Sequence, residues 1–154
     1  MYSKEEIKET KTLFYTSFGK YMNKNKSLEG KRIKWMNYPT RVKHIYARLH
    51  VDKKTASLYI NLQHRDDEIR DLFYEQFIEL KTVFSNIMGD TWIWEKNAIN
   101  GSGIKCSRIS IVLGNVNLFE KETWPDIFNF FEENLVNFDQ FWNEFKDLFK
   151  QLED

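Results

Sequence analysis

The residues best suited to bind an anion are concentrated in one stretch of the chain, residues 20–54. This stretch holds eleven lysines and arginines against two acids, Glu29 and Asp52, and aromatic side chains are interleaved with the cations. Lysine and arginine contact phosphates, and aromatic rings stack on bases. The pattern therefore predicts a surface for nucleic acid or for an acidic partner. The residues expected to form it are Lys31, Arg32, Lys34, Trp35, Arg41, Lys43, His44, Tyr46 and Arg48.

The charge distribution of the whole chain leaves a second interpretation open. Residues 1–65 hold fifteen basic and five acidic side chains, a net charge of +10. The remaining residues hold eight basic and eighteen acidic side chains, a net charge of −10, so the total is zero. In the second interpretation the basic half is a solvated surface that binds no ligand. Its charge is balanced by the acidic half, within one chain or across a dimer.

A second candidate site is the polar face of a predicted hairpin between residues 43 and 63. Apolar and polar residues alternate along both strands, so their polar side chains share one face. If this face is open, it can stack bases or hold a small anionic ligand. If the first helix covers it, its members become half-buried rim residues. With additions from the residue after the hairpin and from a later strand, the candidate ligand face consists of His50, Tyr59, Asn61, Gln63, His64 and Arg108.

Templates for catalysis fit the sequence poorly. The three histidines and the single cysteine, Cys106, match no zinc-ligand spacing, and no glycine-rich phosphate loop or nucleophile elbow occurs. We therefore expect no metal site and no cofactor, and the sequence favours a non-catalytic domain. The remaining enzymatic hypothesis places His44, His50, His64 and Tyr46 in one pocket, with His64 as the candidate for proton transfer.

Length and composition describe the domain that must position these residues. A chain of 154 residues fits one domain, and 16% aromatic residues with six glycines and two prolines exclude a disordered or collagen-like chain. No apolar run approaches the roughly 18 residues that a membrane span needs. No secretory signal follows Met1, and one cysteine cannot form an internal disulfide. These observations predict a cytoplasmic protein that does not enter membranes.

Hydrophobic spacing predicts seven elements, in the order helix, strand, strand, helix, strand, strand, helix. They are a helix at 3–22, the two hairpin strands, a helix at about 66–89, a strand at 92–94, a strand at 108–113 after a loop at 97–103, and a helix from Trp124. The predicted fold class is a single α+β domain over residues 1–154. It has a four-stranded, mainly antiparallel sheet and a long C-terminal helix.

The predicted C-terminal helix carries a seam of large apolar residues. Their spacing alternates between four and three: Trp124, Phe128, Phe131, Leu135, Phe138, Trp142, Phe145, Phe149 and Leu152. Two helices cover one face of a four-stranded sheet, so a third must stack outside, cross the other face or pair with a partner chain. The seam is too apolar to face water, and it belongs either to the core or to a dimer contact.

Several segments of the chain resemble a known family. They are Trp35–Tyr38 with Lys43–Tyr46, the run from His64 to Phe77, and Ser107–Ile109 with the later Trp124–Pro125. Together they resemble a bacterial domain-of-unknown-function family, numbered forty-two sixty-eight. Its members occur alone or follow a domain that resembles a restriction-endonuclease-type nuclease. The resemblance implies an association with DNA processing or defence, and it supplies no catalytic residues.

Our leading hypothesis is a non-catalytic domain whose basic N-terminal half binds nucleic acid or docks on a nuclease or other nucleic-acid-bound partner. The first alternative is a homodimeric structural or interaction module, paired through the apolar seam or the opposed charges. The second alternative is an enzyme with the histidine and tyrosine site described above.

Overall fold

The computed structural model describes residues 1–153, and its elements follow the predicted order. The helices and strands are α1 (Lys4–Met22), β1 (Ile45–Val51), β2 (Thr55–Leu62), α2 (Asp67–Glu79), α3 (Lys81–Met88), β3 (Ile93–Ile99), β4 (Lys105–Gly114) and α4 (Trp124–Lys150). Two short 3-10 turns, η1 (Trp35–Asn37) and η2 (Lys121–Thr123), precede β1 and α4. The α+β fold, the four-stranded sheet and the long C-terminal helix are confirmed.

The four strands form one antiparallel sheet in the order β1-β2-β4-β3. In its centre, Ile60 on β2 pairs with Ala47 on β1 and with Ile109 on β4, and all three side chains are buried. Side chains alternate along each strand, so the residues next to these point to the opposite face. The sheet therefore has an apolar inner face and a polar outer face.

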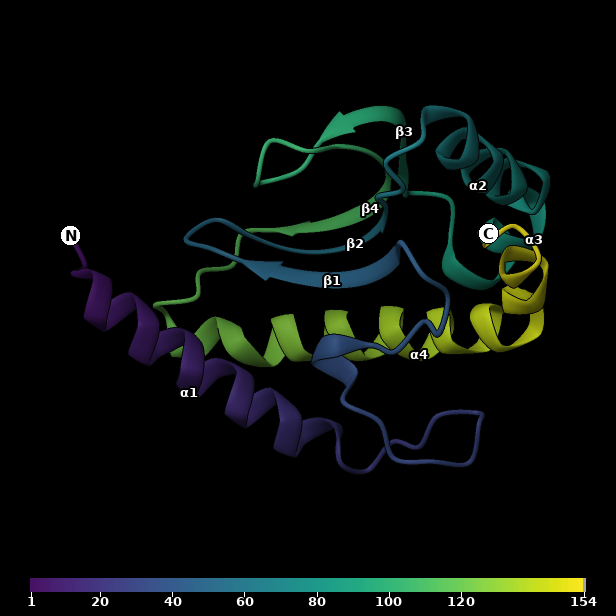
Figure 1. Cartoon of the computed structure of the whole chain (residues 1–154). Coiled ribbons are helices and arrows are strands. Elements are labelled where there is room, and N and C mark those ends of the chain that lie inside the picture. Colours follow the sequence, from purple (N-terminus) through teal and green to yellow (C-terminus); the bar gives the residue numbers. More distant parts are fainter. Residues whose placement is uncertain (154) are drawn as a thin grey trace.

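The helices gather on the inner side of the sheet and pack through aromatic rings. Figure 1 shows α4 running beside the sheet, α1 beyond α4, and α2 with α3 at one end. The rings of Phe14 and Phe18 on α1 lie 5.3 and 5.5 Å from the ring of Phe128 on α4. Of the three placements predicted for a third helix, α1 takes the stacked one. Within residues 1–153, none of the helices is both long and apolar enough to cross a bilayer.

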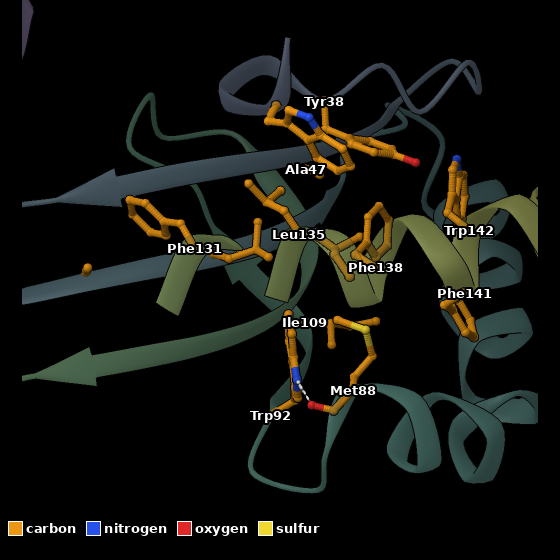
Figure 2. Close-up of a cluster of buried hydrophobic side chains, with 14 of the residues drawn as sticks. Tyr38, Ala47, Met88, Trp92, Ile109, Phe131, Leu135, Phe138, Phe141 and Trp142 are labelled. Carbon is orange, nitrogen blue, oxygen red and sulfur yellow. Dashed lines mark hydrogen bonds between the residues drawn. The ribbon is translucent and has the colours of Figure 1, made fainter. Parts of the chain in front are cut away.

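The apolar seam of α4 forms the core of this chain. Phe131, Leu135 and Phe138 are fully buried between the strands and the other helices (Figure 2). The Trp142 indole N–H donates a 2.7 Å hydrogen bond to the carbonyl of Thr40, and this bond ties the helix to the segment before β1. Of the two roles predicted for the seam, the core is the one found.

The helix expected over residues 66–89 is interrupted at Leu80, so that part of the prediction is wrong. Leu80 leaves helical geometry (φ −94°, ψ 7°) between α2 and α3. The interruption redirects the chain. Phe77 packs against Phe149, with ring centroids 4.4 Å apart, and Phe84 packs between Trp92 and Trp94. Tertiary packing of these rings decides the break, since no glycine or proline marks it.

The loop expected at residues 97–103 is also partly wrong, because β3 continues to Ile99. After an irregularity between Glu95 and Ala98, Ala98 and Ile99 pair with Cys106 and Lys105 on β4. Hydrogen bonding to β4 keeps these residues in a strand, although apolar and polar residues do not alternate in the local sequence.

Candidate nucleic-acid interface

A groove of about 580 Å³ lies between the segment 37–48 and the end of α4. It brings together five of the nine residues predicted to bind nucleic acid: Arg41, Lys43, His44, Tyr46 and Arg48. α4 adds Lys150, and Glu153 follows it. Sequence analysis missed these last two residues, because their contribution depends on the direction in which α4 ends.

Hydrogen bonds from several elements fix the wall of the groove. The Thr40 hydroxyl donates to the carbonyl of Ile45 over 2.6 Å, and the Thr40 carbonyl accepts from the indole of Trp142. The Lys43 backbone N–H donates to the Glu153 carboxylate over 2.9 Å. The backbone carrying the cations is therefore held by the core and by the residues that follow α4.

Two residues of the groove adopt backbone conformations that non-glycine residues rarely take. Arg41 has φ +63° and His44 has φ +71°, both in the left-handed region. Such conformations cost of order 1 kcal/mol or more each and are concentrated at functional sites. Both residues line the groove and lie within four positions of each other. The surrounding structure therefore holds the backbone of this segment in conformations that its own residues disfavour.

The electrostatics of the groove favour an anionic ligand. Among residues 1–153, Lys43, Arg48 and Lys150 form no ion pair, and all three side chains are exposed. Arg41 pairs with Glu29 over 3.2 Å, and this contact holds the pKa of the Glu29 carboxyl below its usual range. Glu153 is the acid that lines the groove, so cations outnumber acids there.

Two of the three histidines meet beside the groove. The His44 and His64 rings lie 4.5 Å apart, and the His64 Nδ1 accepts a hydrogen bond from the Asp66 backbone N–H. Burial lowers the pKa of His44, and the nearby charges of His64 and Lys43 lower it further. His50 lies at the other end of β1, 3.3 Å from the Asp52 carboxylate. The structure therefore does not bring the three histidines and Tyr46 into one pocket.

The middle of the sheet's outer face carries three of the six residues of the predicted ligand face, Tyr59, Asn61 and Arg108. In one row across the strands, Tyr46 pairs with Asn61 and Asn61 with Arg108. In the next row, Arg48 pairs with Tyr59. The Arg108 Nε donates to the Asn61 amide oxygen over 3.2 Å, which fixes the arginine side chain over the sheet.

The other members of the predicted ligand face lie at its ends. Gln63 follows β2, and its backbone N–H donates to the His44 carbonyl over 2.8 Å. His64 comes next and contacts His44 beside the groove, whereas His50 marks the opposite end of β1.

The remaining residues of the predicted basic surface do not line the groove. Lys31 and Arg32 are exposed in the connection between α1 and η1, where the Arg32 guanidinium donates to the Asn23 carbonyl. Lys34 lies beside α1 with Gly19 and Met36. The Trp35 side chain is 5% exposed, so its ring belongs to the core and has no free face for stacking.

Neither a metal centre nor a reactive thiol is apparent at these surfaces. Within residues 1–153 no group of three or more histidine, cysteine, aspartate or glutamate side chains is arranged to hold a metal ion. The Cys106 thiol is free and 1% exposed, so it is a buried structural side chain.

Residues 10–146 match the model of a family described as Domain of unknown function (DUF4268). The match includes the segments that carry the resemblance, from Trp35 to Pro125. No curated protein and no solved structure matches the chain.

Proposed function

We propose that this chain, which belongs to the DUF4268 family of domains of unknown function, binds nucleic acid without catalysis through the groove between residues 37–48 and the end of α4. One observation carries the proposal. Five residues that the sequence marks as cationic or aromatic binding candidates converge there and meet Lys150 from the opposite end of the chain. Cations that face solvent without acidic partners are what phosphate binding requires.

The choice of nucleic acid over another anion rests on the aromatic and basic side chains together. Tyr46 and Arg48 line the groove and continue onto the outer face of the sheet, so phosphate contacts and ring surfaces are adjacent. The setting that we propose is DNA processing or defence, which the family resemblance implies, in the bacterial cytoplasm.

The proposal is tested with the double variant Lys43→Gln/Lys150→Gln in fluorescence anisotropy titrations of labelled single- and double-stranded oligonucleotides. We expect wild-type protein to bind with an affinity that falls as salt rises from 50 to 200 mM. The variant is expected to bind more weakly. The slope of log affinity against log salt should fall by about 1 for each lysine removed.

A matched control is Lys81→Gln/Lys121→Gln, which makes the same change in net charge at exposed positions away from the groove. The control should bind like wild type. Absence of any salt-sensitive binding at micromolar protein, or equal losses in the two double variants, would refute the groove as a nucleic-acid site.

A further inference from the structure

The large side chains on the outer face of the sheet are exposed or half-buried. All the aromatic packing between helices and strands described above is on the inner face. On the outer face, Val112 on β4 is 49% exposed and Ile93 on β3 is 52% exposed, at the far side from the groove. Arg48 and His50 on β1 are exposed at the near side. Between them lie Ser57 on β2 and Ser110 on β4, whose small side chains are 7% and 8% exposed.

Two arginine–tyrosine pairs stand on this face. The Arg48 guanidinium lies 4.5 Å from the centre of the Tyr46 ring, and the Arg108 guanidinium lies 5.3 Å from the centre of the Tyr59 ring. Each pair spans the same two neighbouring rows of the sheet. Tyr46 and Arg108 lie in one row, and Arg48 lies directly opposite Tyr59 in the next. Planar guanidinium groups and aromatic rings are both surfaces on which unpaired bases stack, and the positive charges favour the phosphates that accompany them.

The size of the sheet decides between single and double strands. Four strands at about 4.8 Å spacing are wider than the roughly 12 Å major groove of a duplex, which admits a helix or a two-stranded ribbon. In a duplex the base faces are already stacked on one another, so the tyrosines and arginines would find no ring to contact. A single strand presents its bases freely to such a surface.

We infer that the outer face of the sheet, through Tyr46, Arg48, Tyr59 and Arg108, is a stacking platform that makes the protein select single-stranded over double-stranded nucleic acid. The inference rests on the proposed function, since Tyr46 and Arg48 belong both to the groove and to the platform. A strand would place its phosphates along the groove cations and its bases on the open sheet.

The test compares Tyr59→Leu with Tyr59→Phe, because Tyr59 lies on the platform and does not line the groove. Wild-type protein is titrated with a 15-nucleotide single-stranded DNA, the RNA of the same sequence, and the matching DNA duplex. We expect tighter binding of single strands than of duplex. Tyr59→Leu should weaken single-strand binding about fivefold or more and leave duplex binding unchanged. Tyr59→Phe, which keeps the ring, should bind like wild type.

Tyr2→Leu is the matched control, since Tyr2 is 42% exposed and stacks on Phe119 away from the sheet face. Arg108→Gln provides a second platform variant if Tyr59→Leu fails to fold, and it should show the same selective loss. Thermal melts establish that each variant is folded.

Different failures have different meanings. If duplex binds as tightly as single strands and Tyr59→Leu changes nothing, while Lys43→Gln/Lys150→Gln weakens both, the platform is refuted and the groove stands. If no oligonucleotide binds at 50 mM salt, both the platform and the proposed function are refuted. If Tyr59→Leu instead abolishes a concentration-dependent self-association in sedimentation, the face is a protein contact and the platform is refuted.

Discussion

The Asp139 carboxylate is 2% exposed and accepts hydrogen bonds from four donors that carry no formal charge. The Ser27 hydroxyl and the Leu28 backbone N–H donate over 2.8 Å each, and the Tyr38 hydroxyl donates over 2.6 Å. Burial, followed by this hydrogen bond to Asp139, raises the pKa of Tyr38 well above its usual range. One side chain on α4 thus anchors the irregular segment between α1 and β1 at two places, near residue 27 and at Tyr38.

Replacing Asp139 with alanine should lower the free energy of unfolding by about 3 kcal/mol, because several buried donors lose their acceptor together. Urea denaturation measures the change. Asp139→Asn is the control: it keeps one oxygen that can serve the three donors to Oδ1, and its loss should be about half as large. Equal and small losses in both variants would contradict this role.

The His44 ring gives the protein a pH dependence whose sign follows from its environment. The pKa of this ring falls below its usual 6.5 in the folded protein, first through burial and then through His64 and Lys43. The unfolded chain therefore binds the proton more tightly, so stability is full above about pH 6.5 and declines as the pH falls from there through the folded pKa.

We expect His44→Asn to show a smaller loss of stability between pH 7.5 and pH 5.5 than wild type, as measured by urea denaturation at each pH. Asparagine is chosen because it tolerates the positive φ at this position. His50→Asn makes the same exchange at the exposed end of β1, and there the wild-type decline should persist. A decline in His44→Asn as steep as in wild type would disprove the assignment.

At the scale of single residues, the sequence identifies chemistry better than position. The side chains of the groove are recognisable by type, since Lys43, Tyr46 and Arg48 stand out as cations beside rings. Trp35 has the same signature yet faces the core, because local spacing in an irregular segment does not reveal which side is covered. The sequence contains one indication of the role of Asp139. This acid lies among Leu135, Phe138 and Trp142 on the apolar side of a helix, and a buried carboxylate there needs hydrogen-bond donors.

At the scale of elements, α4 contributes six of the fifteen buried aromatic side chains among residues 1–153, more than any other helix or strand. Phe138 is fully buried, and its ring packs against those of Tyr38 and Trp142, with centroids 5.3 and 5.5 Å away. The helix therefore joins the segment before β1 to the core as well as filling the space beneath the sheet.

Phe138→Ala should cost about 3–5 kcal/mol of unfolding free energy, because a large ring is removed from a fully packed site. Leu148→Ala on the same helix is the comparison, since Leu148 is 38% exposed and its loss should cost about 1 kcal/mol or less. Chemical denaturation of both variants measures the difference. Similar values for the two would mean that the seam is not the core of the folded chain.

Elements with a regular spacing of apolar residues could be predicted from the sequence. Features that depend on contacts with other elements could not. The hairpin strands and the seam of α4 are read directly from alternation and heptad spacing. The break at Leu80 depends on where Phe77 and Phe84 find their neighbours, and the extension of β3 to Ile99 depends on the backbone of β4. Both are properties of the assembled sheet and helices.

At the scale of the whole molecule, the two oppositely charged halves are joined mainly by bonds that do not use the basic side chains. Within residues 1–153, one ion pair links a cation of the 20–54 stretch to a carboxylate of α4, Lys24 with Glu132 at 3.2 Å. Asp139 and Glu153 bind neutral groups and backbone N–H groups of that stretch instead. Lys43, Arg48 and Lys150 of the groove therefore stay available although the total charge is zero.

This arrangement predicts that the protein is retained on a cation-exchange resin at pH 7. A protein of zero net charge whose charges were spread evenly over its surface would pass through. Lys43→Gln/Lys150→Gln should elute at lower salt than Lys81→Gln/Lys121→Gln, although both carry the same net charge. Elution of the two double variants at the same salt concentration would show that the groove is not the dominant positive surface.

The bonds that hold the groove also set the order in which it can form. Ser27 and Tyr38 reach Asp139, Thr40 reaches Trp142, and Lys43 reaches Glu153, each across more than a hundred residues of chain. During synthesis the basic segment leaves the ribosome long before any of these partners exists. The nascent chain therefore exposes its cations without their scaffold until α4 has been made, and a ribosome that stalls before residue 139 carries a basic segment that cannot assume its folded shape.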